Sequence, residues 1–141
     1  MSGTIILDNE AVQALSAVSH PKHRRALALL DVDNQRARRR AGEATAVLVP
    51  VAVRIEAGWD RTHPRAALVN SLSRARDVTL GTPRANHATQ LKVTLGVSVV
   101  DATIAETAQR APRPIRILTS DTSDMTMIAA HLNREIRVIT L

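Results

Sequence analysis

Short apolar runs rich in β-branched residues recur along the chain, and longer segments with helical spacing of apolar residues separate them. The runs are nearly continuously apolar, which is typical of parallel strands buried on both faces. We expect strands at 4–7, 45–49, 78–80, 115–119 and 137–141. We expect helices at 9–18, 22–40, 50–58, 64–75, 83–95, 101–110 and 121–133. Because strand and helix alternate throughout, the pattern predicts an α/β sandwich with a mostly parallel sheet.

Composition narrows this picture. The 141 residues show no repeat, low-complexity segment or linker, so we expect one domain over 1–141. There is no Phe or Tyr and only one Trp, so the core must be built from aliphatic side chains. The absence of cysteine excludes a disulfide scaffold and a thiol nucleophile. No apolar stretch approaches the roughly 20 residues that span a bilayer, so we expect a soluble, cytoplasmic protein without membrane contact.

The net charge of +6 points to a polyanionic partner, either a nucleic acid or an acidic protein. Of the 19 basic residues only Lys22 and Lys92 are lysines, and arginine suits both phosphate and carboxylate contacts. The run RARRR at 36–40 is either a phosphate-contacting patch or a solvated helix end. With almost no aromatic residues, a nucleic acid would be held mainly through its backbone.

Acidic residues follow the predicted strands. Asp8 follows the first strand, Asp121 follows the fourth, and Asp124 comes one helical turn later. Asp101 begins a helix after 96–100, and Glu56 lies in the helix that follows the second strand. The carboxyl ends of parallel strands lie along one edge of a sheet, where open α/β sheets bind ligands. These carboxylates can therefore converge there.

Two interpretations of these acids remain open. Aspartate is a favoured helix N-cap, and Asp8, Asp101 and Asp121 all stand at apparent helix starts. Several carboxylates close together repel one another, however, unless a positive group lies among them. Arginine could serve, but clustered oxygen ligands open to water are what Mg²⁺ or Mn²⁺ uses.

The order of these pieces resembles the PIN-domain ribonucleases, and most closely the VapC toxins of bacterial VapBC toxin–antitoxin pairs. The resemblance covers essentially the whole chain and rests on IILDNEAVQAL at 5–15, Glu56 in VRIEAGW, VVDATIAETA at 99–108 and ILTSDTSDMTMIA at 117–129. The third and fourth pieces are the more specific. By this resemblance the metal-site acids fall on Asp8, Glu56, Asp101 and Asp121, with Asp124 as an auxiliary ligand.

The resemblance also carries expectations about fold, chemistry and partners. It implies a five-stranded sheet in order 3-2-1-4-5, flanked by helices, with the strands that precede Asp8 and Asp121 side by side. It implies a Mg²⁺- or Mn²⁺-dependent endoribonuclease acting on single-stranded or looped RNA such as tRNA or rRNA. A cognate VapB-like antitoxin and a homodimer are implied as well. We expect the apolar faces around Val12, Leu15, Leu27 and Leu30 to form a groove for an antitoxin helix.

One departure from the family pattern leaves alternatives open. Glu10 stands where the family carries Ser, Thr or Asn, and it can bind metal, pair with an arginine or obstruct the substrate. It favours the alternative of a non-catalytic PIN module that binds RNA or a protein. A second alternative is phosphoryl transfer, as in phosphatases or receiver domains. Against it, no lysine lies near the predicted strand ends in the sequence.

Overall fold

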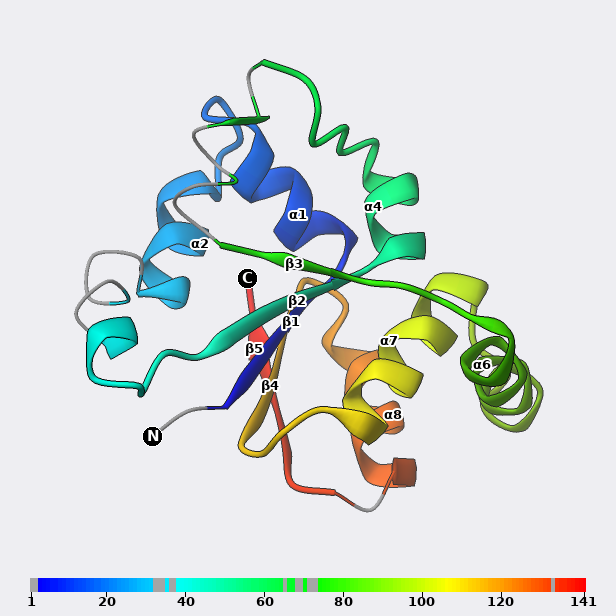
Figure 1. Cartoon of the computed structure of the whole chain (residues 1–141). Helices are drawn as coiled ribbons and strands as arrows, with labels where there is room; N and C mark the ends of the chain where they lie inside the picture. The colour runs from blue at the N-terminus through cyan, green and yellow to red at the C-terminus, as the bar shows by residue number, and fades with distance from the viewer. Residues whose placement is uncertain are drawn as a thin grey trace.

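A five-stranded parallel sheet in the order β3-β2-β1-β4-β5 forms the centre of the computed structural model (Figure 1). The structure describes residues 3–31, 35, 38–64, 66–67, 70, 74–132 and 134–141. The strands are β1 (Thr4–Leu7), β2 (Ala46–Pro50), β3 (Arg76–Val78), β4 (Ile115–Thr119) and β5 (Ile136–Thr140). All neighbouring strands are parallel, so the predicted fold class and strand order are confirmed.

Burial along the strands follows their position in the sheet. Every residue of β1 is buried, and β4 has one half-buried residue, whereas the edge strands β3 and β5 carry half-buried and exposed residues. The third strand was predicted at 78–80 but begins two residues earlier. Its register pairs Arg76 with Leu48 and Val78 with Pro50. Because this strand is at the edge, its apolar pattern is a weaker guide to its position than that of a central strand.

Helices cover both faces of the sheet. They are α1 (Asn9–Ser16), α2 (His23–Leu30), α4 (Val51–Ala57), α6 (Thr82–Leu95), α7 (Val99–Arg110) and α8 (Thr122–Leu132). Helices α1 and α2 pack together on one face, and α7 packs with α6 and α8 on the other (Figure 1). Helix α4 contacts both α1 and α7, so it spans the carboxyl edge of the sheet. None of the described helices has the length and apolar content needed to cross a membrane.

The single helix predicted at 22–40 is wrong. Helix α2 ends at Leu30, because Asp31 adopts a left-handed conformation (φ 53°) and its N–H donates to the carbonyls of Leu27 and Ala28. Residues 38–40 are helical again, while 32–34, 36 and 37 lie outside the described residues. The helix predicted at 64–75 also falls partly on residues that are not described. No glycine or proline lies between residues 22 and 40, which is why the break was not visible in the sequence.

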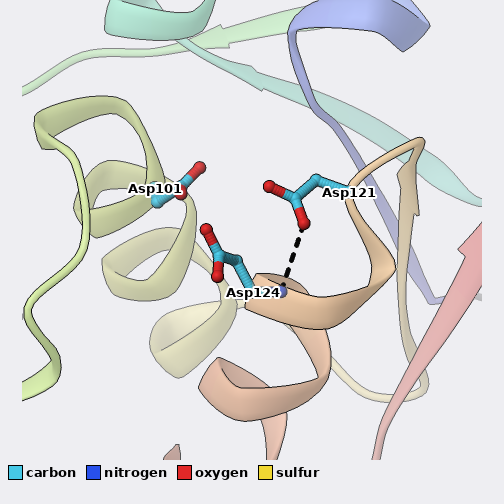
Figure 2. Close-up of side chains that lie close together, drawn as sticks. All are labelled: Asp101, Asp121 and Asp124. Carbon is cyan, nitrogen blue, oxygen red and sulfur yellow. Dashed lines mark hydrogen bonds between the residues drawn. The ribbon is translucent and has the colours of Figure 1, made fainter.

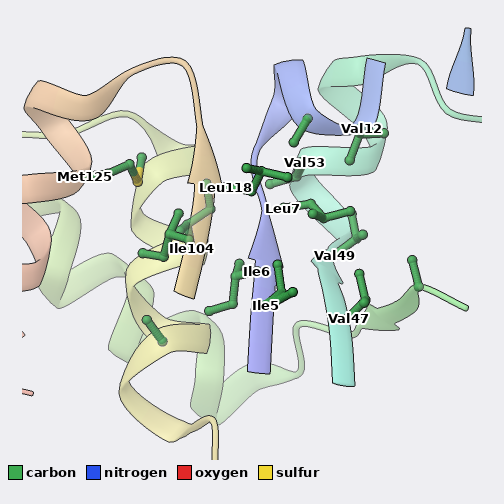
Figure 3. Packing of buried hydrophobic residues seen from close by; sticks show 14 of the residues in the cluster. Ile5, Ile6, Leu7, Val12, Val47, Val49, Val53, Ile104, Leu118 and Met125 are labelled. Carbon is green, nitrogen blue, oxygen red and sulfur yellow. The ribbon is translucent and has the colours of Figure 1, made fainter. Parts of the chain in front are cut away.

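The core is aliphatic, as the composition predicted (Figure 3). Side chains of the central strands meet those of α1, α4 and α7 to either side of the sheet, among them Ile6, Leu7, Val12, Val53 and Ile104. The apolar groove that was expected around α1 and α2 is not present, because its residues belong to the core. Val12 and Leu15 are fully buried, Leu30 is 1% exposed and Leu27 is half-buried, so these side chains stabilise the core and offer little surface to a partner.

Trp59, the only aromatic residue, lies just beyond the end of α4. The helix ends at Gly58, whose left-handed backbone (φ 67°) turns the chain. The indole is 5% exposed, and the guanidinium of Arg61 lies over its ring, 4.7 Å from the ring centre. Arg54 donates to the carbonyl of Trp59 at 3.2 Å. These contacts of Trp59 hold the segment that follows α4 in place.

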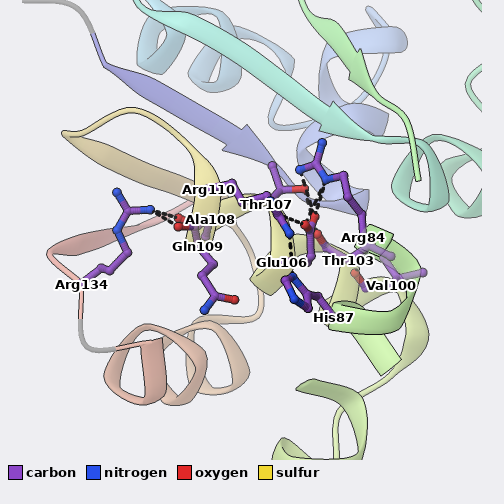
Figure 4. Close-up of polar contacts among 10 residues, drawn as sticks. All are labelled: Arg84, His87, Val100, Thr103, Glu106, Thr107, Ala108, Gln109, Arg110 and Arg134. Carbon is purple, nitrogen blue, oxygen red and sulfur yellow. Dashed lines mark hydrogen bonds and ion pairs between the residues drawn. The ribbon is translucent and has the colours of Figure 1, made fainter. Parts of the chain in front are cut away.

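A buried carboxylate joins α6 to α7 (Figure 4). Glu106 is 1% exposed, and both of its oxygens accept from Arg84 Nε at 3.0 Å. Arg110, one turn further along α7, donates to Glu106 from Nε at 2.5 Å and to His87 Nδ1 at 2.6 Å. Two guanidinium groups thus compensate one buried charge, and they hold the helix that carries Asp101 against α6.

We expect Glu106→Gln to lower the free energy of unfolding by about 2 kcal/mol, because a charged hydrogen-bond acceptor between two cations is replaced by a neutral amide. Urea denaturation followed by circular dichroism measures this change. Glu135→Gln is the matched control, since Glu135 is exposed, and it should leave the midpoint unchanged. Equal midpoints for the two variants would show that the buried ion pair adds no stability.

Candidate metal centre

The predicted acidic residues line one cavity at the carboxyl edge of the sheet. Adjacent strands β1 and β4 lead to Asp8 and Asp121, α7 brings Asp101, and α4 brings Glu56. The cavity has a volume of about 260 Å³, and these four carboxylates are part of its wall. It is open to water, and no basic residue is found among the described residues that line it.

Three carboxylates converge most closely. Asp101, Asp121 and Asp124 each place one oxygen so that all three oxygens lie within 4.8 Å of one another (Figure 2). Asp121 caps α8, where its Oδ1 accepts from the N–H of Asp124 at 3.2 Å. Asp124, expected as an auxiliary residue, is therefore a full member of this group. Asp8 and Glu56 line the same cavity but are not part of the three.

Asp101 does not begin its helix. Ser98 is the N-cap of α7, and its hydroxyl accepts from the N–H of Asp101 at 3.1 Å. Asp101 thus occupies the third helical position, and the capping interpretation is wrong for this residue. It is correct for Asp8, whose Oδ1 accepts from the N–H of Ala11 at 3.0 Å. Since Ser98 already caps α7, Asp101 has no capping role that explains its place at the cavity.

A threonine that the sequence did not single out connects two of the acids. Thr119 ends β4 and is fully buried. Its hydroxyl donates to Asp8 Oδ2 and accepts from the N–H of Asp121 at 2.9 Å. With Ala11 on Oδ1, both oxygens of Asp8 are held in place. The only sequence signal was a hydroxyl residue at the end of a strand, and its partners became visible only with the register of β1 and β4.

The electrostatics of the cavity disfavour uncompensated negative charge. The pKa of Asp101 is raised to about 6, mainly by burial and in addition by the nearby charges of Asp124 and Asp121. The pKa of Asp8 is also raised, mainly by burial, although its hydrogen bonds to Thr119 and Ala11 oppose the shift. Like charges gathered in a partly desolvated site each stabilise the protonated form of the others. A divalent cation would remove this conflict.

Asn9 provides an independent indication of a ligand. Its Nδ2 donates to Glu56 Oε1 at 3.0 Å, which orients Glu56 across the cavity. Its Oδ1 is buried and has no hydrogen-bond partner among the described atoms. A buried polar oxygen without a partner is costly. Because amide and carboxylate oxygens are the ligands that Mg²⁺ and Mn²⁺ prefer, the donor set fits such an ion.

Glu10 pairs with a lysine, whereas an arginine was expected from the sequence as its cationic partner. Its carboxylate lies 2.8 Å from Lys22 Nζ, and hydrogen bonds from Lys22 and Ser120 lower its pKa. The expectation that no lysine lies near the strand ends is therefore wrong, because residues beyond α1 return to the cavity rim. The charge of Lys22 is neutralised by Glu10, so it does not compensate the three converging aspartates.

The sequence matches no protein-family model and no curated protein. Among solved structures, the chain is similar to the one described as "Crystal structure of PAE2754 from Pyrobaculum aerophilum". The likeness covers 98% of this chain and 92% of that chain, with 18% sequence identity and a TM-score of 0.51. What the two share is a fold. At this level of identity the comparison carries no information about activity, so function must be argued from the cavity.

Proposed function

We propose that the chain is a metal-dependent ribonuclease that hydrolyses RNA phosphodiester bonds. The observation that carries the proposal is the convergence of oxygens from Asp101, Asp121 and Asp124 within 4.8 Å. Asp101 and Asp121 line a cavity whose described lining contains no basic residue. Such an arrangement is unfavourable by itself and favourable around a divalent cation. Because the cavity is open to water and holds no cysteine, hydrolysis by water is the chemistry it supports.

Each acidic residue has a distinct role in this proposal. Asp101, Asp121 and Asp124 would hold one ion, with Glu56 and Asn9 facing them across the cavity. A bound Mg²⁺ or Mn²⁺ supplies a water of lowered pKa and stabilises charge on the attacked phosphate. Asp8 and Thr119 act behind these ligands, because their hydrogen bonds fix the β4–α8 turn from which Asp121 projects.

The substrate and partners follow from charge and from resemblance. A net charge of +6, supplied almost entirely by arginine, suits a phosphate backbone. The resemblance to VapC toxins supports single-stranded or looped RNA, such as tRNA or rRNA, as the substrate in the cytoplasm. It also supports a homodimer neutralised by a VapB-like antitoxin. Co-expression with the adjacent gene product should then give one complex on a sizing column, and separate elution would contradict this part.

We expect RNA cleavage to require added Mg²⁺ or Mn²⁺ and to fall by at least about 100-fold in a chelator, because oxygen-ligand sites of this kind exchange their ion readily. The measurement is cleavage of a single-stranded RNA by the purified chain, with the metal restored at the end as a control. Undiminished cleavage in chelator would refute the metal centre. RNA binding without cleavage under any metal would instead favour a non-catalytic module.

A further inference from the structure

A second cavity lies at the opposite edge of the sheet, and arginines line it. It has a volume of about 260 Å³ and is formed where β2 and β3 begin (Figure 1). Its basic residues are Arg39, Arg74 and Arg76. Thr45 is also part of the wall, and its hydroxyl accepts from a fourth guanidinium, that of Arg116, at 3.5 Å. Arginines from three separate parts of the sequence thus bring positive charge to one place.

The three arginines that line this cavity have no carboxylate partner among the described residues. Other arginines of the chain do: Arg38 pairs with Asp31, and both Arg54 and Arg61 pair with Asp77. Both Arg74 and Arg76 are exposed, and Arg39 is half-buried. Guanidinium groups around a shared cavity repel one another unless an anion lies between them. The cluster is therefore suited to bind negative charge from outside the chain.

The backbone at Arg74 has an uncommon conformation. Arg74 has a φ of 51°, and its N–H donates to the carbonyl of Asn70 at 3.1 Å. This left-handed conformation closes a helical turn, and Gly or Asn is the usual residue there. A side chain with a Cβ is disfavoured in this region by about 1 kcal/mol. Arg74 thus holds a side chain at the edge of the cavity in a backbone conformation that its Cβ disfavours.

We propose that Arg39, Arg74 and Arg76 bind phosphate groups of the RNA backbone, at a distance from the bond that is cut. The proposal rests on the proposed ribonuclease function and adds a second contact for the same substrate. The edge strand β3 is three residues long, which corresponds to about 10 Å, so a short oligonucleotide reaches both ends of it. The planar fork of arginine matches phosphate oxygens.

The surface between the two cavities also favours a nucleic acid as the occupant. Asp77 follows Arg76 on β3 and is flanked by Arg54 and Arg61, so two cations surround one anion. Arg54 lies two residues before Glu56, which lines the acidic cavity. These pairs leave one net positive charge beside β3, the strand that begins at the arginine cavity. An extended polyanion fits positive charge that is spread along a strand in this way better than an isolated acidic group does.

The test compares two triple variants of equal charge. The first is Arg39→Gln, Arg74→Gln and Arg76→Gln, and the matched control is Arg24→Gln, Lys92→Gln and Arg137→Gln, three exposed cations on α2, α6 and β5. Binding of a fluorescent single-stranded RNA is measured by anisotropy in chelator, which prevents cleavage. We expect the first variant to bind on the order of tenfold more weakly at 0.1 M salt, and its salt slope to fall by about two. The control should change affinity by less than about twofold.

Several outcomes would overturn the inference. They are an equal loss of affinity in both triple variants, no loss in the first, or no RNA binding by the parent chain. Unchanged RNA binding together with loss of an acidic protein partner would assign the cavity to that partner instead.

Cleavage of a short oligonucleotide by the parent chain tests the proposed function separately. If RNA is cut but the first triple variant binds it normally, only the arginine site is wrong. If RNA binding depends on the arginines but no RNA is cut with metal, only the ribonuclease proposal fails.

Discussion

Asp101→Asn is expected to leave the chain folded and to lower RNA cleavage by at least about 100-fold. A neutral amide is a poorer Mg²⁺ ligand than a carboxylate. Loss of a residue that merely supports a metal ligand already costs about 10- to 100-fold, so loss of a direct ligand should cost at least as much. Initial rates of RNA cleavage at saturating Mg²⁺ measure the effect, and Mn²⁺ titration measures the loss of metal affinity. Expression of the variant should also be less toxic than expression of the parent.

The same substitution should change the pH dependence of stability in the metal-free chain. The pKa of Asp101 is about 6 in the folded state against a reference value of 3.8, so the folded chain holds this proton more tightly than the unfolded chain does. Its contribution to stability is complete below about pH 3.8 and is lost as the pH rises through about 6. Because asparagine does not ionise, Asp101→Asn removes this loss of stability at higher pH. Its melting temperature should exceed that of the parent at pH 7 and equal it near pH 4.

Asp60→Asn is the matched control for both measurements. Asp60 is exposed, and hydrogen bonds from Thr62 lower its pKa, so the sign is opposite. Its contribution to stability is present at neutral pH and is lost as the pH falls below its usual range. Asp60→Asn should therefore not stabilise the chain at pH 7 and should cut RNA like the parent. A folded Asp101→Asn chain that cuts as fast as this control would refute the site assignment.

Thr119→Val is expected to lower cleavage by about 10- to 100-fold although Thr119 touches no proposed metal ion. Valine has nearly the same shape, but it can neither donate to Asp8 nor accept from the N–H of Asp121. Residues that orient metal ligands typically contribute this much. Because a buried carboxylate and a partly buried N–H each lose a partner, the free energy of unfolding should also fall by about 1–3 kcal/mol. Cleavage rates, Mn²⁺ affinity and urea denaturation measure the three effects.

Thr119→Ser separates the hydroxyl from the packing of the methyl group. Serine keeps both hydrogen bonds but removes one buried methyl group, at a cost of about 1 kcal/mol. The serine variant should therefore be less stable than the parent and still cut RNA within about threefold of its rate. If the serine and valine variants lose cleavage equally, Thr119 acts through packing, and its hydroxyl does not position the acidic residues.

Local patterns of the sequence were sufficient for the sheet because its central strands are continuously apolar, and the resemblance to a known fold supplied their order. The acidic cavity could be predicted for a related reason, because a residue that directly follows a parallel strand lies at the carboxyl edge of the sheet. Boundaries were less predictable. Asp101 was taken for an N-cap because Ser98, three residues earlier, lay inside an apolar run that did not resemble a helix start. The break at Asp31 is likewise a single backbone conformation, and no glycine or proline between residues 22 and 40 marks it.

Roles that depend on tertiary contacts were not visible in the sequence. Thr119 is one of several threonines, and only the pairing of β1 with β4 brings its hydroxyl to Asp8. Glu106 lies within a piece used for the family resemblance, yet its partner Arg84 comes from another helix. The basic run at 36–40 was noticed, but its association with Arg74 and Arg76 requires the start of β3. In each case the partner lies far along the chain, where no periodicity connects the two residues.

The single tryptophan gives the chain a built-in optical probe. With no tyrosine present, ultraviolet-excited emission comes from one indole, packed beneath Arg61 and 5% exposed. Its emission should shift to longer wavelength when the segment behind α4 opens to water. Trp59 lies three residues after Glu56, so we expect an ion that draws Glu56 toward the aspartates to shift the end of α4, against which the indole lies. Metal binding can then be followed by fluorescence, without a label and without RNA.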